Sequence, residues 1–278
     1  MSVIRVACVQ MRSGTEVAPN IAAASALIRE AAGKGAKFIA TPEMTNLLDI
    51  RPGMARPKIV EQDDVPLHAF QALAAELGVT LLIGSLAVTL EDDERFANRS
   101  FLIGPDGGVI ARYDKIHMFD VEVGDGQNYR ESRAYRPGET AVLAKAPFGA
   151  VGMTICYDLR FPHLYRRLAQ AGAEILTIPA AFTRVTGEAH WHVLIRARAI
   201  ETGCFVIAPA QGGKHEDGRE TFGHSLIVSP WGEVLAEAPG AEPGVVLAEL
   251  DLEAVAKARG RIPSLGNDRD VQLTKFGF

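Results

Sequence analysis

The residue best suited to chemistry in this chain is Cys156, which stands where a predicted strand meets a predicted helix. The apolar-rich run 151–155 reads as a buried strand, and Pro162 suits a helix start. Backbone N–H groups at such a junction can lower the pKa of a thiol and bind a developing oxyanion. The ordinary alternative is that a lone cysteine at a strand end is a small buried apolar residue. The segment alone leaves both interpretations open.

Three charged residues stand where they could assist such a thiol. Glu43 follows the predicted strand 38–41, and Lys115 ends the second strand of a predicted hairpin. Glu131 lies in the long segment 119–137, which we interpret as a lid rather than a core element. A glutamate can act as general base toward a thiol, and a lysine ammonium can stabilise an oxyanion. Taken one at a time, such side chains are more typical of a solvated surface.

Composition limits the class of protein. The 278 residues are 47% hydrophobic, which allows a large core, and the net charge of −5 argues against a nucleic-acid partner. The sequence has no run of about 18 apolar residues, so it predicts no membrane span. The cysteines are odd in number and far apart, which favours a reduced, cytoplasmic protein without a disulfide frame.

Metal and cofactor signatures are missing from the sequence. His190 and His192 are two residues apart on a predicted helix, so they do not share a face, and no histidine–carboxylate spacing typical of a metal site joins them. We interpret His192 as a structural histidine. The glycines at 104–108 belong to a hairpin turn rather than a phosphate-binding loop. We therefore expect no metal and no cofactor.

Predicted strands and helices alternate along the whole chain. We expect strands at 4–11, 38–41, 79–86, 101–104, 109–113, 151–156, 175–179, 204–210, 225–228, 234–238 and 245–250, and helices at 20–32, 67–77, 164–170, 191–202 and 252–259. This alternation, mixed with hairpins, predicts an α/β fold of two mixed sheets covered by helices. We expect one domain over 1–278, with a core at about 3–255 and a C-terminal tail at 256–278.

Glu43, Lys115 and Cys156, in this order and each at a strand end, resemble the Glu-Lys-Cys triad of the nitrilase, or carbon–nitrogen hydrolase, superfamily. The resemblance runs from about residue 3 to 270, and its motifs are Thr41-Pro42-Glu43, Tyr113-Asp114-Lys115-Ile116-His117, Gly152-Met153-Thr154-Ile155-Cys156-Tyr157-Asp158-Leu159-Arg160-Phe161-Pro162 and Ser229-Pro230-Trp231-Gly232-Glu233. It implies a four-layer α-β-β-α sandwich and a homo-oligomer. It also implies that Cys156 is the nucleophile, Glu43 the general base and Lys115 the oxyanion support. Glu131 would position the substrate or the base, and the backbone N–H of Tyr157 would be the second oxyanion donor.

Within the superfamily, the stretches 182–191 and 196–202 resemble the branch that contains omega-amidase and deaminated-glutathione amidase. Both act on amides of a 2-oxo dicarboxylic acid, and they release ammonia and cysteinylglycine respectively. The stretch 210–216 is more similar to the deaminated-glutathione amidases than to the omega-amidases. A glycine-containing loop there would leave room for a dipeptide, whereas a tighter loop would suit ammonia. The resemblance implies a substrate site that includes Tyr157, Arg160, Phe182, Thr183, Thr186 and His190.

Other functions remain as alternatives. Hydrolases of N-carbamoyl amino acids often have two consecutive arginines where this chain has Leu159 and Arg160, so a carboxylate clamp would be incomplete here. Arg160 can equally be structural and pair with Asp158. A non-catalytic member would bind a metabolite and signal to a partner, but such a protein has no need of a nucleophile beside a base. We expect a cysteine amidase that hydrolyses a small linear amide through a thioester, with deaminated glutathione as substrate and 2-oxoglutaramate as the alternative.

Overall fold

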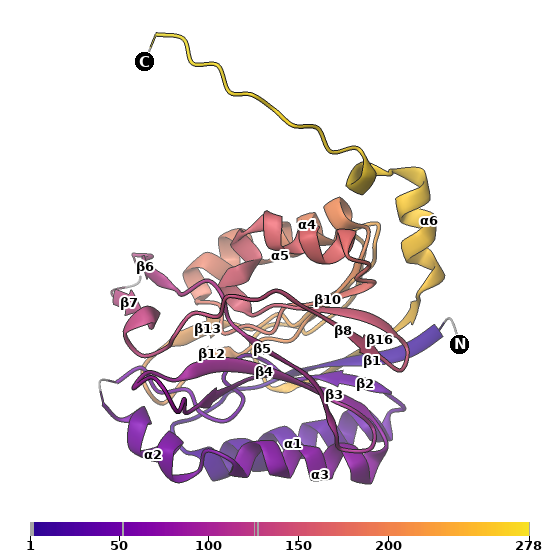
Figure 1. Cartoon of the computed structure of the whole chain (residues 1–278). Helices are drawn as coiled ribbons and strands as arrows, with labels where there is room; N and C mark the ends of the chain where they lie inside the picture. The colour runs from indigo at the N-terminus through magenta and orange to yellow at the C-terminus, as the bar shows by residue number, and fades with distance from the viewer. Residues whose placement is uncertain (1–2, 52, 125, 127, 278) are drawn as a thin grey trace.

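Two six-stranded mixed sheets lie face to face at the centre of the protein (Figure 1). The computed structural model describes residues 3–51, 53–124, 126 and 128–277. The first sheet has the order β16 (Gly244–Asp251), β1 (Val3–Gln10), β2 (Phe38–Ala40), β3 (Thr80–Val88), β4 (Ala97–Ile103), β5 (Val109–Asp114). The second has the order β15 (Val234–Glu237), β14 (Leu226–Val228), β11 (Phe205–Ala208), β10 (Ile175–Thr177), β9 (Gly149–Met153), β8 (Val142–Ala146). Within each sheet the three parallel strands, β1–β2–β3 and β9–β10–β11, are flanked by antiparallel ones.

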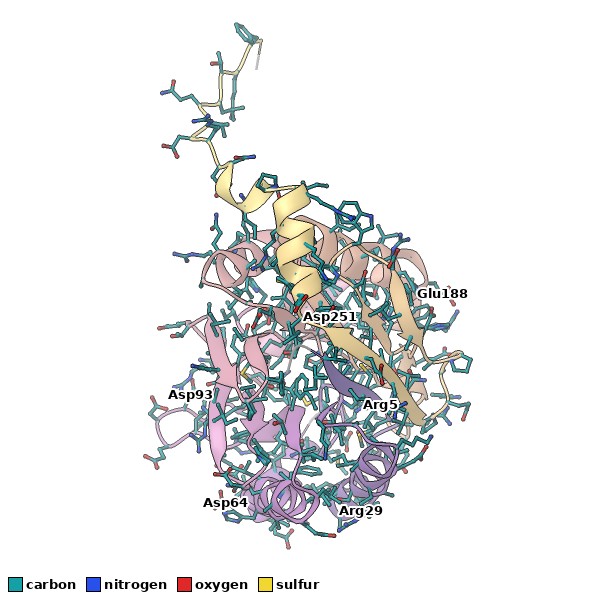
Figure 2. The ribbon with its side chains drawn as sticks, turned by 90° about the vertical axis from the view of Figure 1, so that its right-hand side faces the viewer. Arg5, Arg29, Asp64, Asp93, Glu188 and Asp251 are labelled. Carbon is teal, nitrogen blue, oxygen red and sulfur yellow. The ribbon has the colours of Figure 1, made fainter. Side chains whose placement is uncertain are left out.

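Helices cover the outer face of each sheet. Helices α1 (Val17–Gly33) and α3 (Val65–Leu77) lie on the first sheet, and α4 (Pro162–Gln170) and α5 (Arg184–Thr202) lie on the second (Figure 1). The short α2 (Ala55–Glu61) lies near α1, and α6 (Glu253–Arg261) follows β16 at the side of the layers. Exposed charged side chains such as Arg29, Asp64 and Glu188 lie on the outside of the helical layers (Figure 2). The predicted α-β-β-α sandwich is confirmed.

The alternation of side chains along a strand explains why both faces of the first sheet are buried. In β1, Val6 and Cys8 belong to the apolar cluster between the two sheets, whereas Ala7 and Val9 belong to the cluster under α1 and α3. Because both clusters exclude water, the strand is apolar on both faces and reads as a continuous hydrophobic run. The same layer between the sheets includes Met153, so it extends to the strand end that precedes Cys156.

Several elements differ from the sequence-based expectations. Helix α5 begins at Arg184 rather than Trp191, because the Thr183 hydroxyl caps it by accepting a bond from the Thr186 N–H at 3.4 Å. Strand β8 and helix α2 had no clear signal. The segment expected as a lid holds the hairpin of β6 (Asp120–Glu122) and β7 (Asn128–Arg130) and a 3₁₀ turn, η1 (Glu131–Arg133). A second small hairpin consists of β12 (Gly212–Lys214) and β13 (Glu220–Phe222) (Figure 1).

Strand β9 ends at Met153, so Cys156 lies beyond the strand, at the start of the 3₁₀ turn η2 (Cys156–Arg160). A third such turn, η3 (Ser264–Gly266), follows α6. In the described part of the chain, none of the helices combines the length and the apolar character needed to cross a membrane.

Candidate active site

The three residues of the predicted triad meet at one buried point. Glu43 follows β2 and Lys115 follows β5 in the first sheet, and Cys156 follows β9 in the second. The Lys115 Nζ lies 2.8 Å from Glu43 Oε1, and the Cys156 thiol is hydrogen-bonded to the Glu43 carboxylate. The exposed fractions of Glu43, Lys115 and Cys156 are 4%, 2% and 6%. None of the three is therefore a solvated surface group.

Glu131 belongs to the same charged group. Its Oε2 lies 2.8 Å from Lys115 Nζ and accepts a bond from the Phe119 N–H at 2.7 Å. Asn98 of β4, which the sequence analysis missed, donates its side-chain amide to Glu43 Oε1 at 2.9 Å and to Glu131 Oε1 at 3.1 Å. No sequence signal marks Asn98, because it is a polar residue inside an otherwise ordinary strand. The group thus has two carboxylates around one ammonium, cross-linked by one amide.

The backbone of the turn that carries the Cys156 thiol is strained. Cys156 has a φ of 47°, in the left-handed region that side-chain-bearing residues rarely adopt. Its N–H donates to the Pro179 carbonyl at 2.9 Å, and the preceding Ile155 N–H donates to Asp158 Oδ2 at 2.8 Å. These bonds stabilise a sharp turn between β9 and η2, and Cys156 stands at the first position of that turn. A nucleophile on a strained strand-to-helix turn is a recurrent way to expose a reactive atom.

Asp158 connects this turn to the strand that carries Lys115. Its carboxylate is fully buried and accepts bonds from the Tyr113 hydroxyl at 2.6 Å and from the His117 N–H at 3.1 Å. The His117 ring nitrogen Nδ1 lies 2.7 Å from the same carboxylate. Tyr113 and His117 flank Lys115 in the sequence, so Asp158 fixes the distance between the two halves of the site. The alternative pairing of Asp158 with Arg160 is not formed.

The charged group shifts the ionisation of its members. Burial alone would raise the pKa of Glu43, but the Lys115 charge and the hydrogen bonds from Lys115, Cys156 and Asn98 hold it below its ordinary value of 4.5. Burial would lower the pKa of Lys115, but the charges of Glu131 and Glu43 raise it well above its ordinary value of 10.5. At neutral pH the site therefore contains an ionised Glu43 beside a charged Lys115.

The thiol behaves differently from the sequence-based expectation of a lowered pKa. Burial, followed by the negative charge of Glu43, raises the pKa of Cys156 well above its ordinary value of 9.0, although Lys115 acts in the opposite direction. The backbone N–H groups near the turn do not offset the loss of solvation. The site holds a neutral thiol hydrogen-bonded to an ionised carboxylate, so the thiol needs a base at the moment of attack.

A cavity of about 660 Å³ gives access to this group. Its lining includes the four charged or nucleophilic residues and also Phe182, Thr183 and Thr186, which the sequence analysis had assigned to the substrate site. Tyr157, Arg160 and His190 are not part of this lining. The Arg160 guanidinium lies 5.3 Å from the centre of the Phe182 ring, and its Nη2 lies 3.2 Å from His190 Nδ1. In this structure Arg160 therefore packs against Phe182, which lines the cavity, and does not line the cavity itself.

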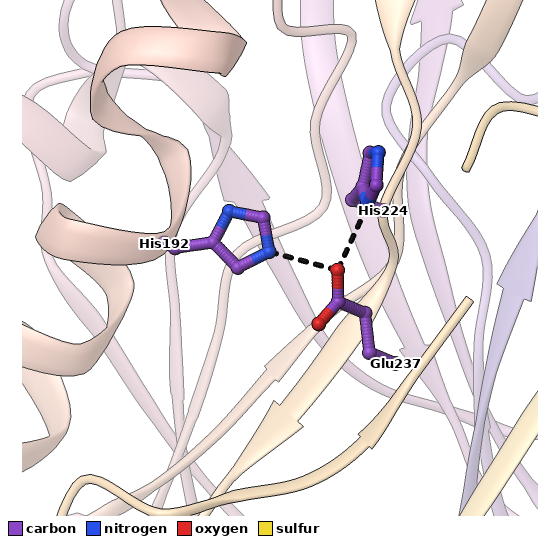
Figure 3. A group of neighbouring side chains, drawn as sticks. All are labelled: His192, His224 and Glu237. Carbon is purple, nitrogen blue, oxygen red and sulfur yellow. Dashed lines mark hydrogen bonds and ion pairs between the residues drawn. The ribbon is translucent and has the colours of Figure 1, made fainter. Parts of the chain in front are cut away.

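A histidine pair lies outside the cavity (Figure 3). His192 Nε2 and His224 Nδ1 both hydrogen-bond Oε1 of Glu237, at 2.8 Å and 2.7 Å. In the described part of the chain, this is the one group of histidine, cysteine and carboxylate side chains close enough to share a metal ion. The hydrogen bonds to Glu237 join α5 to β15. They agree with the structural interpretation of His192.

Comparisons with known proteins agree with this geometry. A family model described as carbon–nitrogen hydrolase matches residues 5–260. A relative from Synechocystis sp. (strain PCC 6803 / GT-S), a deaminated glutathione amidase, is 40% identical over 265 residues, which cover 93% of this chain and 96% of that protein. The crystal structure of the C. elegans NitFhit protein has a TM-score of 0.90 and 33% identity, over 96% of this chain and 65% of that one. A structure of a mutant amidase from Nesterenkonia sp. AN1, with acrylamide added at its active-site cysteine, has a TM-score of 0.78 and 25% identity, over 94% of this chain and 98% of that one. The chain belongs to the carbon–nitrogen hydrolase family and is a hydrolase that acts on carbon–nitrogen bonds.

Proposed function

We propose that the protein is a cysteine amidase that hydrolyses deaminated glutathione to 2-oxoglutarate and cysteinylglycine. The observation that carries the chemistry is the buried group of Glu43, Lys115 and Cys156 at the wall of the cavity. The choice of substrate is supported by the activity named for relatives that are about as similar as the Synechocystis amidase.

Acylation begins with proton transfer from Cys156 to Glu43. The Glu43 carboxylate takes the thiol proton while the sulfur attacks the amide carbon, so a free thiolate is not needed beforehand. The developing oxyanion is stabilised by the Lys115 ammonium and by the backbone N–H of Tyr157. This N–H follows Cys156 directly and donates to no acceptor in the described part of the chain. Glu43 then gives the proton to the leaving nitrogen, the C–N bond breaks, and a thioester remains.

Deacylation repeats the same steps with water as nucleophile. Glu43 takes a proton from the water as it attacks the thioester carbon, and the second oxyanion is held by the same two donors. When this intermediate collapses, the C–S bond breaks and the proton returns to the Cys156 sulfur. Glu131 accepts a bond from Lys115 and Asn98 donates one to Glu43, and Asn98 also donates to Glu131, so these two residues hold Lys115 and Glu43 in place throughout.

The test of the substrate is a comparison of specificity constants. Purified protein is assayed with deaminated glutathione and with 2-oxoglutaramate, by following release of 2-oxoglutarate, and with an N-carbamoyl amino acid, by following release of the amino acid. We expect the highest kcat/KM for deaminated glutathione, because binding of the dipeptide can be used to stabilise the transition state. Equal or better turnover of 2-oxoglutaramate would assign the protein as an omega-amidase. Hydrolysis of the N-carbamoyl amino acid alone would overturn the branch assignment.

A labelling experiment separates an enzyme from a metabolite-binding protein. The three cysteines are buried and free, but of these Cys156 is the one in the cavity lining. If Glu43 takes its proton, Cys156 should react with iodoacetamide far faster than Cys8 or Cys204, and this difference should disappear in Glu43→Gln. Equal labelling of the three cysteines in the unaltered protein would favour the non-catalytic alternative.

We also propose that the protein is a cytoplasmic homo-oligomer. The three cysteines are buried and form no disulfide with one another, which supports a reducing compartment. Support for self-association comes from apolar side chains on and beside α5: Val193, Ile200 and Trp231 are 69%, 54% and 48% exposed. Val193→Glu should shift the mass measured by light scattering toward the monomer. An unaltered protein that is already monomeric at micromolar concentration would contradict the proposal.

A further inference from the structure

The cavity wall carries an excess of positive charge, although the net charge of the chain is −5. Among the described residues that line it, six arginines and Lys115 stand against four carboxylates. A concave site of one sign attracts ligands of the opposite sign. The cavity is therefore built for an anion, even though the protein as a whole is acidic.

Most of these arginines already bind acceptors of the protein itself. Arg51 pairs with Asp49 and Arg95 pairs with Asp93, each at 2.7 Å. Arg56 and Arg130 donate to backbone carbonyls, and Arg130 also pairs with an exposed glutamate. Because their donors are engaged, these four arginines have little left for a ligand.

Arg219 differs from the other arginines of the cavity lining in one of its donors. Arg133, the fifth of those arginines, is exposed to solvent, whereas Arg219 is partly buried. It lies between β12 and β13 and lines the cavity, and its Nε is buried without a hydrogen-bond partner in the part of the chain that the structure describes. No described carboxylate pairs with its guanidinium, which lies 5.8 Å from the centre of the Tyr129 ring. A buried donor without an acceptor costs about 1–3 kcal/mol, so it is rarely kept without a reason. A carboxylate in the cavity would supply acceptors for this side chain.

The charge of the catalytic group is a second reason to expect a positively charged side chain in the cavity lining. Glu43 and Glu131 outnumber Lys115, so the reacting centre has a net charge of −1 when the thiol is neutral. An amide that carries a carboxylate is repelled by this centre unless a separate cation binds the carboxylate away from the reacting carbon. Arginine suits this task, because its planar guanidinium can bind both carboxylate oxygens at once.

We propose that Arg219 is a carboxylate-binding residue of the substrate site. It takes the role that the sequence analysis had considered for Arg160, which lies outside the cavity lining. The inference rests on the proposed function for the identity of the amide, but the ligand chemistry it requires is any amide that bears a carboxylate. Deaminated glutathione has one carboxylate on the acyl side and one on the leaving group, and 2-oxoglutaramate has only the first.

The experiment compares Arg219→Gln with Arg95→Gln as a matched control. Arg95 lines the same cavity, but Asp93 neutralises it, so its loss should leave turnover unchanged. We expect Arg219→Gln to lower kcat/KM by about 10–100-fold, the range given by a charge-assisted hydrogen bond. Arg219→Lys should recover part of this loss, because it keeps the charge but not the two-pronged geometry. If kcat/KM falls for both deaminated glutathione and 2-oxoglutaramate, Arg219 binds the carboxylate on the acyl side. If it falls for deaminated glutathione alone, Arg219 binds the carboxylate of the leaving group.

Alkylation of Cys156 by iodoacetamide, which has no carboxylate, distinguishes ligand binding from a structural role. The alkylation rate should be the same in Arg219→Gln and in the unaltered protein. Equal kcat/KM in Arg219→Gln and Arg95→Gln, or an alkylation rate that falls as much as turnover, would overturn the proposal. The test uses whichever carboxylate-bearing amide the unaltered protein hydrolyses, N-carbamoyl amino acids included. Failure of deaminated glutathione as a substrate would therefore refute the proposed function without deciding the role of Arg219.

Discussion

Replacement of Glu43 by Gln tests the proposed chemistry directly, because it keeps the shape of the side chain and removes its ability to take a proton. In the structure both carboxylate oxygens accept hydrogen bonds. Oε1 accepts from Lys115 Nζ at 2.8 Å and from Asn98 Nδ2 at 2.9 Å, and Oε2 accepts from the Ala181 N–H at 2.9 Å. Whichever way the new amide turns, its NH₂ group faces another donor. The variant loses the base and at least one of these bonds.

The size of the two effects can be worked out separately. Loss of a general base costs about 10²–10⁴ in rate, which is about 3–5 kcal/mol in the barrier. Removing one member of a buried ion pair costs about 3–5 kcal/mol of stability when the other charge is left alone. Here Glu131 still pairs with Lys115 at 2.8 Å, so we expect a loss closer to one charge-assisted hydrogen bond, about 2 kcal/mol. This corresponds to a Tm that is lower by about 4–8 °C.

Two measurements check this expectation: kcat/KM between pH 6 and 9, and Tm by calorimetry. Burial, the main cause that raises the pKa of Cys156, remains in the variant, although the charge of Glu43 is gone. Without a base the variant reacts only through the small thiolate fraction, so its rate should rise with pH. The rate of the unaltered protein should stay flat over the same range. A variant whose kcat/KM stays within a factor of a few of the unaltered value, with a parallel pH profile, would refute Glu43 as the base.

Further predictions follow from the same group. Cys156→Ala should abolish turnover while circular dichroism and substrate binding by calorimetry remain, and residual hydrolysis would exclude a thioester. Lys115→Met should lose about 10²–10³-fold or more in kcat, because the carboxylates of Glu43 and Glu131 then lie near the oxyanion without the cation that paired with both. Near-normal kcat would contradict the role of Lys115. Asp158→Asn should lower Tm by about 4–8 °C, equivalent to about 2 kcal/mol, and an unchanged Tm would show that its buried bonds contribute nothing. Because the pKa of Glu43 is lowered, its contribution to the free energy of unfolding is complete above its ordinary value of 4.5 and is lost as pH falls through the lower folded-state pKa. Unfolding of the unaltered protein and of Glu43→Gln from pH 6 down to 3 checks this sign, since the stability difference should shrink only at the acidic end.

The sequence was informative where chemistry follows the end of a strand. Glu43 and Cys156 follow β2 and β9, which are parallel strands of the two sheets, so the carboxyl ends of these strands carry them to the site. Lys115 follows the antiparallel β5, and a hairpin signal was enough to place it at a strand end. Local patterns of this kind depend only on neighbours in the chain, which is why they could be recognised before the fold was known.

Other features depend on how the sheets pack. Asn98 reaches Glu43 and Glu131 only because β4 lies beside β5 in the first sheet, and no local pattern marks an asparagine inside a strand. The sequence analysis considered Asp158 only as one possible partner of Arg160, whereas the structure pairs it with Tyr113 and His117, at the end of β5 in the opposite sheet. Arg219 lies between β12 and β13 and lines the cavity, whereas the sequence analysis had considered only the stretch 210–216 before it. The positions of Asn98, Asp158 and Arg219 in the site all depend on contacts between residues that are far apart in the sequence.

The charge of the site explains why a buried, neutral thiol is suited to this reaction. At rest the carboxylates of Glu43 and Glu131 both pair with the one Lys115 ammonium, which gives a net charge of −1. When Glu43 takes the proton from Cys156 and the sulfur attacks, the negative charge moves from the Glu43 carboxylate to the substrate oxygen. The net charge of the group stays at −1, and Lys115 neighbours the negative charge in both positions. A preformed thiolate would instead place a third anion beside two carboxylates, in a site shielded from water. Coupling proton transfer to attack avoids that state, and the hydrogen bonds that already hold Lys115 require no reorganisation as the oxyanion forms.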